Sequence, residues 1–512
     1  MKRIHYLLIA LTITVGCFLT VDAWTGAPRE AIANSPSLGI PVIESVAADG
    51  TVDVSVEVES VTETIGGKPV TSGVYDLRLF RDGQLVGSSI PQAAMEEYIR
   101  KAPPAVEQDI RLNKVIDTAE DALWRAANNL FDAASPNLKV ITPRKKAVYT
   151  FHNIQLPRDG RQSVEFSAYA FNSDRVKSDT SRLSYEVPKL PAPTQPKAYI
   201  VSVGVNRSDI GGDWTLSCAV KDAQTTQSAL AERLRSRYDV VPIELTSSNS
   251  DGSSPATRNA IKANIQAVLE KLSGVTPGDK DLASLRSSLG QTLLDKIARS
   301  TPQDLVVVTF SSHGVADAAG NFYVLPSDIR MSKANQKIPD YTSMISSDEL
   351  SLWMRDLDAA DTVMIVDACH AAAAVDTPGF KPAPMGSRGL GQLAYDKQMR
   401  ILTATRAKDI AVEIKGNIQG VCQGLLTYAL VTDGLQLGLA DFKPKQDGKI
   451  MFDEWLQFGR DDVPSVMKRL KAGELPPAKG FPDEDKARDK DFVQQPTLFD
   501  FRRNKTRDIQ IR

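Results

Sequence analysis

The pattern of hydrophobic and polar positions changes near residue 190. Before that point, short segments such as 52–58 and 163–171 alternate apolar and polar residues. Such alternation is typical of half-buried β-strands. After it, continuous apolar runs such as 305–310 and 362–366 are separated by amphipathic stretches. Continuous runs predict strands buried on both faces of a sheet, and their alternation with helices predicts an α/β unit.

The first unit is predicted to be an all-β sandwich over residues 40–187, of immunoglobulin or fibronectin type. Its turns are frequent, and Asp82-Gly83 is a strong hairpin signal between two short strands. A helical insert is expected at about 92–134, because 92–100 and 106–131 carry apolar residues at helical spacing. The insert either packs on its own sandwich or covers a cleft of the second unit, and the sequence leaves both open.

Domain boundaries follow from proline content. The proline-rich stretch 188–197 predicts a semi-rigid, extended linker. The second unit is predicted over 198–502 as a mostly parallel sheet with helices on both faces. Residues 24–39 have no clear pattern and are taken as a loose lead, and 503–512 are taken as a tail.

Residues 1–23 are predicted to be a targeting segment. Lys2 and Arg3 precede an apolar stretch over 6–19, and small residues stand at the positions before a cleavage site after Ala23. This arrangement predicts a cleaved export signal and a periplasmic or extracellular protein. The alternative is a segment that remains as a membrane anchor, although it is short for a full span.

Composition and charge narrow the choice of partners. The 512 residues carry a formal net charge of −2. Because there is no basic excess, nothing points to nucleic acid or to an anionic membrane surface as a partner. We therefore expect no nucleic-acid partner, and no membrane contact beyond the export signal.

The cysteine count favours a free thiol. Removal of residues 1–23 would leave Cys218, Cys369 and Cys422. An odd number cannot pair completely, so at least one thiol stays free in a compartment that tends to oxidise. This count suits a catalytic thiol better than a disulfide scaffold.

One histidine and one cysteine follow the two most apolar strands. The run 305–310 leads into His313, and the run 362–366 leads into Cys369, 56 residues later. Neighbouring parallel strands would bring both residues to one edge of the sheet, where α/β proteins place their chemistry. A Cys-His dyad for nucleophilic catalysis is the hypothesis that follows. The alternative for Cys369 alone is a small buried apolar residue.

These residues resemble the paired motifs of a known family. Phe310-Ser-Ser-His-Gly314 and Asp367-Ala-Cys-His370 are similar to the Ser-Gly-His-Gly-like and Asp-x-Cys-His-Ser-Gly-like motifs of the caspase-like cysteine peptidases, metacaspase-type branch. The resemblance covers about 197–502 and implies a caspase-like fold. It implies Cys369 as nucleophile and His313 as general base and acid. Ala371-Ala372 and Ser312 depart from the family pattern, which puts substrate fit in doubt.

The resemblance also implies a specificity pocket. Asp222, Asp367 and Ser311 match the family residues that accept Arg or Lys before the cut. Two carboxylates would favour a basic side chain and repel an acidic one. The alternatives are a helix cap for Asp222 and a strand cap for Asp367. The backbone N–H groups of Cys369 and Gly314 are candidate oxyanion donors, since glycine permits close approach of the substrate.

Self-cleavage and cofactors complete the expectations. The segment 377–398 lies where family members are often cut, and Arg388 and Lys381 are the candidate sites. An uncut surface loop is the alternative. Some relatives need calcium, but the sequence contains no recognisable calcium or other metal site, so no cofactor is expected.

Three functions remain open from the sequence. The first is an exported caspase-like endopeptidase that acts on protein or peptide substrates. The second is an adhesion or scaffold protein whose α/β unit binds peptides without cutting them. The presence of both His313 and Cys369 argues against this second function. The third, a cysteine hydrolase of a non-peptide bond, gives no use for the two pocket carboxylates.

Overall fold

The structure is a computed structural model of the whole chain. It describes residues 28–511 except for a set of gaps, and everything said below of structure refers to these residues. The gaps are 102–106, 110–113, 117–124, 126, 134, 190–194, 251–255, 318–320, 334–338, 370, 372–388, 407–408, 416–421, 443–445, 476–477, 481–491 and 504–507. The predicted export signal lies outside the described residues.

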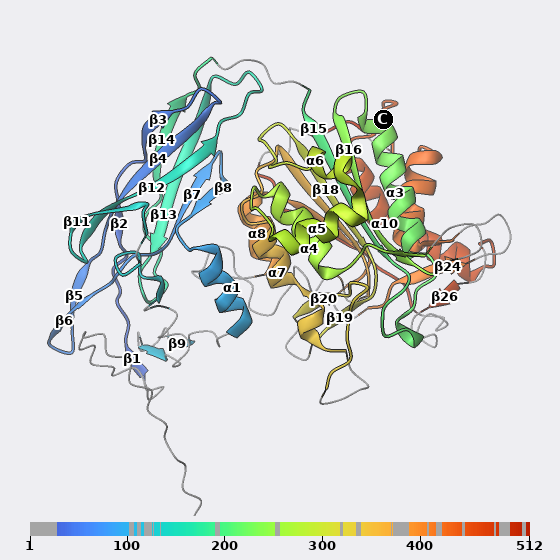
Figure 1. Cartoon of the computed structure of the whole chain (residues 1–512), viewed down its shortest axis with the longest axis horizontal. Helices are drawn as coiled ribbons and strands as arrows, with labels where there is room; N and C mark the ends of the chain where they lie inside the picture. Colours follow the sequence, from blue (N-terminus) through green and yellow to red (C-terminus); the bar gives the residue numbers. More distant parts are fainter. Residues whose placement is uncertain are drawn as a thin grey trace, which may run out of the picture.

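The N-terminal unit consists of two antiparallel sheets (Figure 1). One has the order β11-β12-β4-β2, with β3 also paired to β4, and the other has the order β14-β13-β7-β8. Inward-facing residues such as Val54, Leu77 and Phe166 are fully buried between them. The strands are β2 (Ser37–Leu38), β3 (Val42–Val46), β4 (Thr51–Glu59), β7 (Tyr75–Arg81), β8 (Gln84–Ser88), β11 (Leu138–Thr142), β12 (Lys146–Gln155), β13 (Ser163–Phe171) and β14 (Ser181–Glu186), with a hairpin of β5 (Thr62–Ile65) and β6 (Lys68–Thr71) outside both sheets.

The predicted hairpin around Asp82-Gly83 is confirmed. Strands β7 and β8 pair antiparallel, with Arg81 opposite Gln84. Both turn residues have positive φ, 49° at Asp82 and 79° at Gly83. A two-residue turn of this kind matches the twist of the flanking strands, which is why Asp-Gly is favoured there.

The helical insert is only partly as expected. Helix α1 (Gln92–Lys101) is present. The expected helix over 106–131 is wrong at its beginning, where β9 (Glu107–Asp109) and β10 (Lys114–Ile116) form a small sheet with β1 (Pro28–Glu30). Pairing with a distant segment overrides the local helical spacing of apolar residues.

The loose lead and the tail are both more ordered than expected. The 24–39 stretch contains β1 and β2, and Ile32 is buried, with its N–H donated to Asp174 at 2.6 Å. At the other end, Ile511 is buried and its N–H bonds to the carbonyl of Ile450 at 2.8 Å. Strands of two or three residues are too short to leave a periodic signal, so the sequence could not indicate them.

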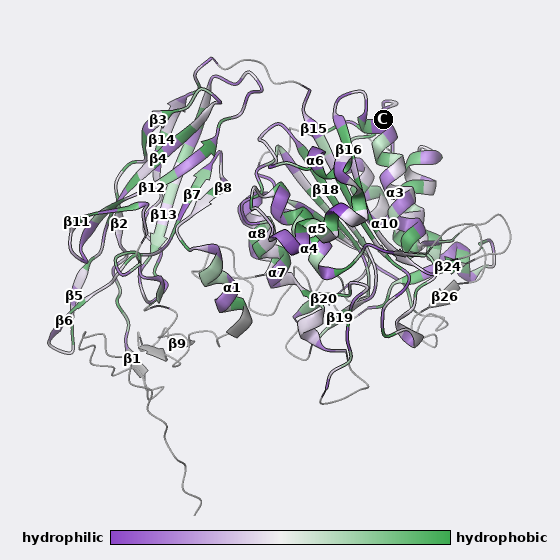
Figure 2. Ribbon diagram, viewed as in Figure 1, coloured by the Kyte–Doolittle hydropathy of each residue, from purple (hydrophilic) through white to green (hydrophobic). Residues whose placement is uncertain are grey.

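The second unit is mixed α/β and contains a seven-stranded sheet of order β17-β16-β15-β18-β22-β23-β27. The strands from β16 to β23 run parallel, and the two edge strands β17 and β27 are antiparallel to their neighbours. Figure 2 shows hydrophobic residues concentrated in the central strands. The strands are β15 (Lys197–Val205), β16 (Asp239–Ser248), β17 (Thr257–Arg258), β18 (Leu305–Ser311), β22 (Asp361–Asp367), β23 (Arg400–Thr403) and β27 (Thr497–Asp500).

Helices cover both faces of this sheet, and a separate hydrophobic core lies on each face. One core joins the sheet to α4, α5, α6, α7 and α8, and the other joins it to α3, α9, η5 and α10. The helices are α3 (Ala219–Leu234), α4 (Lys262–Leu272), α5 (Asp279–Leu289), α6 (Gln291–Lys296), α7 (Ser347–Trp353), α8 (Leu390–Lys397), α9 (Leu425–Thr427), the π-helix η5 (Tyr428–Gln436) and α10 (Phe452–Lys471), with short 3₁₀ turns η2 (Gly212–Trp214) and η3 (Tyr341–Ser343).

Two small antiparallel sheets accompany the main sheet. One follows β18 directly and has the order β19-β20-β21. The other, of order β25-β24-β26, lies beside the N-terminus of α3, whose first residues contact β25. Their strands are β19 (Gly314–Ala316), β20 (Phe322–Val324), β21 (Ile345–Ser346), β24 (Val412–Lys415), β25 (Cys422–Gly424) and β26 (Ala478–Gly480).

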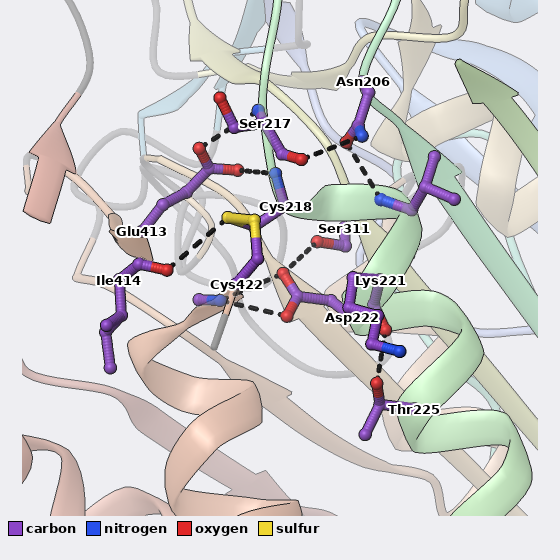
Figure 3. Close-up of a disulfide and its surroundings, with 12 residues drawn as sticks. Asn206, Ser217, Cys218, Lys221, Asp222, Thr225, Ser311, Glu413, Ile414 and Cys422 are labelled. Atoms are coloured by element: carbon purple, nitrogen blue, oxygen red, sulfur yellow. Dashed lines mark hydrogen bonds between the residues drawn. A yellow bond between two sulfur atoms is a disulfide. The ribbon is translucent and has the colours of Figure 1, made fainter. Parts of the chain in front are cut away.

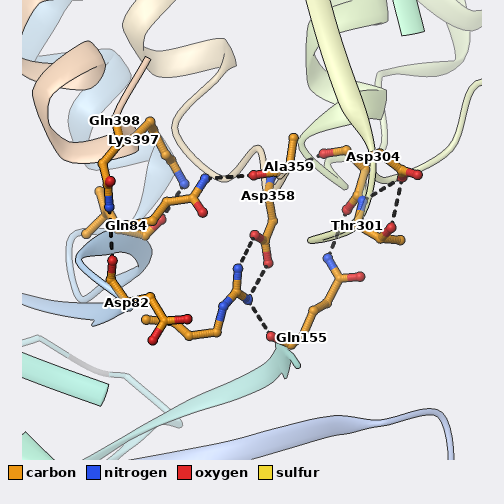
Figure 4. Close-up of polar contacts among 12 residues, drawn as sticks. Asp82, Gln84, Gln155, Thr301, Asp304, Asp358, Ala359, Lys397 and Gln398 are labelled. Atoms are coloured by element: carbon orange, nitrogen blue, oxygen red, sulfur yellow. Dashed lines mark hydrogen bonds and ion pairs between the residues drawn. The ribbon is translucent and has the colours of Figure 1, made fainter. Parts of the chain in front are cut away.

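Buried polar contacts join the two units (Figure 4). Arg81 on β7 makes a two-fold ion pair with Asp358, at 2.8 and 3.0 Å, and both side chains are at most 5% exposed. Gln84 donates to the carbonyl of Ala359 at 3.1 Å, and Lys397 donates to the carbonyl of Leu85 at 2.6 Å. Because buried charges are costly unless paired, these contacts hold the units in one arrangement.

No helix within the described ranges is long and apolar enough to cross a membrane.

Replacement of Arg81 by Ala is expected to destabilise the protein by about 3 to 5 kcal/mol, since it removes the ion-pair partner of the buried Asp358 carboxylate. Urea denaturation would measure the change in unfolding free energy. Arg144→Ala is the matched control, because its ion pair with Asp132 is 64% and 29% exposed. The control should lose no more than about 1 kcal/mol. Equal losses in the two variants would contradict a structural role for the interface pair.

Candidate active site

The register of two parallel strands places His313 and Cys369. Strands β18 and β22 pair over their whole length, and Ser311 lies opposite Asp367 at their ends. His313 and Cys369 each come two residues after that last pair. The N–H of Ser312 donates to the carbonyl of Asp367 at 3.4 Å, so the two chains stay together past the sheet. The two residues therefore leave the sheet side by side, at the edge that the sequence predicted.

The backbones beyond the strands approach very closely. A Cβ atom at Gly314 would lie 2.3 Å from the carbonyl oxygen of Cys369 and 2.9 Å from the ring of Phe322. Any other residue at 314 would push these segments apart, because a carbonyl oxygen on the backbone cannot move aside cheaply. Glycine is thus required here by packing.

Cys369 is a free, buried thiol. Its residue is 5% exposed, and the backbone N–H of Ala411 points to its sulfur at 3.3 Å. The turn that carries it is held by Thr405, whose hydroxyl donates to the carbonyl of Ala368 at 3.1 Å and accepts from the N–H of Ala371 at 3.1 Å. The sulfur is therefore held in one place and is contacted by a backbone donor.

His313 is buried against Trp214 and β20. It is 5% exposed, and its ring centre lies 5.5 Å from that of Trp214. Its carbonyl accepts the N–H of Leu325 at 3.1 Å, and the hydroxyl of the preceding Ser312 donates to the carbonyl of Leu325 at 2.6 Å. Burial lowers the pKa of His313 to about 3, because the apolar surroundings disfavour the imidazolium ion. The ring is therefore neutral at pH 7.

A cluster of acidic side chains lies beside these residues. Asp222, in the first turn of α3, accepts the hydroxyl of Ser311 at 3.0 Å and the N–H of Gly424 at 3.0 and 3.1 Å. Asp367 accepts the hydroxyl of Thr427 at 3.0 Å and its N–H at 3.3 Å. All three sequence-predicted pocket residues, Asp222, Asp367 and Ser311, are buried in the same place.

The sequence did not indicate a third carboxylate, Glu413. It lies on β24, is 8% exposed, and accepts the N–H groups of Ser217 and Cys218 at 3.2 and 2.9 Å. These are backbone donors at the N-terminus of α3, where negative charge is favoured. A glutamate in a four-residue strand, about 190 residues from its partners, leaves no signal in the sequence.

Burial and neighbouring negative charge raise the pKa values of the two aspartates. The pKa of Asp222 is well above its usual range, first because of burial and then because of the charges of Asp367 and Glu413. Burial raises the pKa of Asp367 to about 6, and the negative charge of Glu413 adds to this increase. The hydrogen bonds from Thr427 act in the opposite direction and lower the pKa. The buried cluster thus holds more negative charge than its surroundings stabilise.

The other two cysteines form a disulfide that sequence reasoning did not predict. Cys218, at the N-terminal end of α3, is joined to Cys422 on β25, with Cα atoms 5.0 Å apart (Figure 3). Among the described cysteines, Cys369 is the free one. The odd count did indicate a free thiol, but it could not indicate which cysteines pair.

Several expectations fall outside the described residues. Arg388 and Lys381, the candidate self-cleavage sites, lie in the gaps, as does His370 of the family-like motif. The described part of the chain contains no group of three or more His, Cys, Asp or Glu side chains that could hold a metal ion.

No family model matches the chain, and a search of curated proteins found no match.

Replacement of Gly314 by Ala is expected to destabilise the protein by about 1 to 3 kcal/mol and to disturb the site, because the new methyl group meets the carbonyl of Cys369. Chemical denaturation and the rate of Cys369 alkylation would measure the two effects. Gly278→Ala is the control, since its Cβ would meet only an Asp281 oxygen at 3.6 Å, and its φ is −62°. A Gly314→Ala variant as stable as this control would contradict the close approach.

Proposed function

We propose that the chain is an exported caspase-like cysteine endopeptidase that cuts after Arg or Lys, with Cys369 as nucleophile and His313 as general base. The observation that carries the proposal is the matched position of the two residues. Each follows its strand by two residues, on neighbouring parallel strands paired at Ser311 and Asp367. A buried acidic cluster beside them adds a reason for basic substrates.

In the proposed reaction His313 takes the proton of the Cys369 thiol as the sulfur attacks the carbonyl carbon of the peptide. A thiol is mostly protonated at neutral pH unless its surroundings favour the thiolate, so a neutral base within reach accelerates the attack. The carbon–nitrogen bond then breaks, and His313 returns the proton to the leaving amine. Water, deprotonated by the same ring, hydrolyses the thioester and restores the thiol.

The developing oxyanion would be stabilised by backbone donors. The N–H groups of Cys369 and Gly314 lie on the two segments that approach most closely beyond the sheet. Donors of this kind act at about 3 Å from the oxyanion and need no reorganisation during the reaction. Because Cys369 is 5% exposed, the peptide must displace part of the cover formed by Ile410 and Ala411.

Specificity would come from charge. A guanidinium or ammonium group entering the cluster would be paired by Asp222 and Asp367, with the field of Glu413 added. Two of these carboxyl groups have raised pKa values, so a cation would relieve a repulsion that exists before it binds. An aspartate side chain would meet the same field with the opposite sign.

The first test uses residues 24–512 and fluorogenic peptides that differ only in Arg or Asp before the reporter, with and without calcium. Release from the Arg peptide is expected, and Cys369→Ala or His313→Ala should lower it by about 10³-fold or more. Folding of each variant would be checked by circular dichroism. Release from the Asp peptide instead would remove the acidic pocket from the proposal. No release from either peptide by the folded parent would favour a peptide-binding scaffold.

Charge recognition should depend on pH in a defined direction. Asp367 has a raised pKa of about 6, so it is neutral below that pH and ionised above it. The ratio of kcat/KM for an Arg peptide over a citrulline peptide, which has the same shape without charge, should therefore rise as pH increases from about 5 to 7.5. His313, with a pKa of about 3, does not titrate in this window.

Asp367→Asn is the matched variant for this test, since it keeps the shape and removes the charge. Its ratio should be lower and should change little over the same pH range. A parent ratio that stays flat, or a variant ratio that still rises, would show that another group sets the pH dependence.

A further inference from the structure

The disulfide joins α3, which carries Asp222 of the acidic cluster, to β25, whose Gly424 donates to that aspartate (Figure 3). Cys218 precedes Asp222 by four residues, which is about one turn of α3. Cys422 precedes Gly424 by two residues on β25, so the two have the same orientation relative to the strand. The N–H of Gly424 donates to both oxygens of Asp222. The disulfide and the hydrogen bonds from Gly424 thus both connect α3 to β25, at two positions of α3 that are one helical turn apart.

Glu413 is held by the same end of the helix. Its carboxylate accepts the N–H of Cys218 itself, at 2.9 Å, and the sulfur of Cys218 lies 3.5 Å from the carbonyl of Ile414. The sulfur contact is not a hydrogen bond, because a disulfide sulfur carries no hydrogen. The position of Cys218 therefore sets where two of the three carboxylates stand.

Repulsion acts against this arrangement. Asp222, Asp367 and Glu413 are like charges in a buried place, and each of the two aspartates has its pKa raised in part by the charge of Glu413. A few hydrogen bonds oppose that repulsion, among them those of Gly424, Ser311 and Thr427. The covalent link between α3 and β25 also opposes it, because β25 pairs with β24 and so limits how far Asp222 and Glu413 can separate.

We propose that the Cys218–Cys422 disulfide is a positioning element of the substrate pocket, so that recognition of a basic side chain requires the oxidised pair while the nucleophile Cys369 remains a thiol. The inference rests on the proposed function and goes beyond it. It predicts that one site needs a disulfide for substrate recognition and a free thiol for the chemical step. Cys422 is half-buried and Cys218 is fully buried.

Reduction by a dithiol balances as thiol–disulfide exchange. A thiolate of the dithiol attacks one sulfur of the pair, the Cys218–Cys422 bond breaks, and the second thiol closes the reagent into its own disulfide. Two electrons and two protons pass to the protein and leave two thiols. Cys369 takes no part in this step.

The test measures binding to the full Cys369→Ala chain by calorimetry, which removes the reactive thiol from the experiment. The probes are a peptide amide ending in arginine and the same peptide ending in citrulline. In the oxidised chain the arginine peptide should bind more tightly. After reduction with dithiothreitol and alkylation of the freed thiols, its affinity should fall by about tenfold or more, and that of the citrulline peptide should stay the same.

The outcomes separate this inference from the proposed function. Unchanged preference for arginine after reduction would overturn the positioning role and leave the pocket in place. Absence of any preference in the oxidised chain would overturn the acidic pocket itself, and the inference with it. Equal weakening of both peptides would identify the disulfide as a general structural link.

A variant with both cysteines replaced, Cys218→Ser with Cys422→Ser, gives a second measurement with Cys369 intact. For the Arg peptide KM should rise about tenfold while kcat stays within about threefold, because the nucleophile and base are untouched. Its unfolding midpoint by circular dichroism serves as the folding control. A lowered midpoint with an unchanged arginine-to-citrulline ratio would contradict the proposal.

Discussion

The parallel pairing of β18 with β22 is the constraint on which the candidate site depends. Parallel strands must pass in the same direction, so residues that follow them leave the sheet at one edge. The register sets Ser311 opposite Asp367, and this pairing alone brings His313, Gly314 and Cys369 together. A slip of one residue would turn every side chain of one strand to the opposite face. The register is held because both faces of both strands are buried under helices.

Two kinds of ionisable group lie at that edge of the sheet, and both are buried in surroundings that disfavour their charged forms. Burial keeps His313 neutral, and burial together with neighbouring negative charge raises the pKa values of Asp222 and Asp367 in the adjacent cluster. Both are costly to stability, since neither group is in its most favourable environment. Buried groups with shifted pKa values are common at catalytic sites and at sites that bind charged ligands.

The N-terminal sandwich makes buried contacts with the segments that come before and after β22. Its hairpin β7–β8 sends Arg81 into a buried ion pair with Asp358, which lies three residues before β22 begins. The same hairpin accepts Lys397 of α8, which precedes β23. The sandwich therefore contacts the segments on both sides of the strand that carries Cys369, at the end of the sheet opposite the site.

The sequence by itself determined the local elements and the residues capable of chemistry. Strict alternation indicated β4 and β13, continuous apolar runs indicated β18 and β22, and Asp-Gly indicated the β7–β8 turn. His313 and Cys369 followed from their places at strand ends, and the pocket residues Asp222, Asp367 and Ser311 came from a family resemblance. Only the tertiary structure decided which cysteines pair, the position of Glu413 in the acidic cluster, and the pairing of β10 with β1 in place of a helix. The reason is physical: periodicity and turn chemistry act over a few residues, whereas these contacts join segments that are distant in the chain and meet only when the whole core has formed.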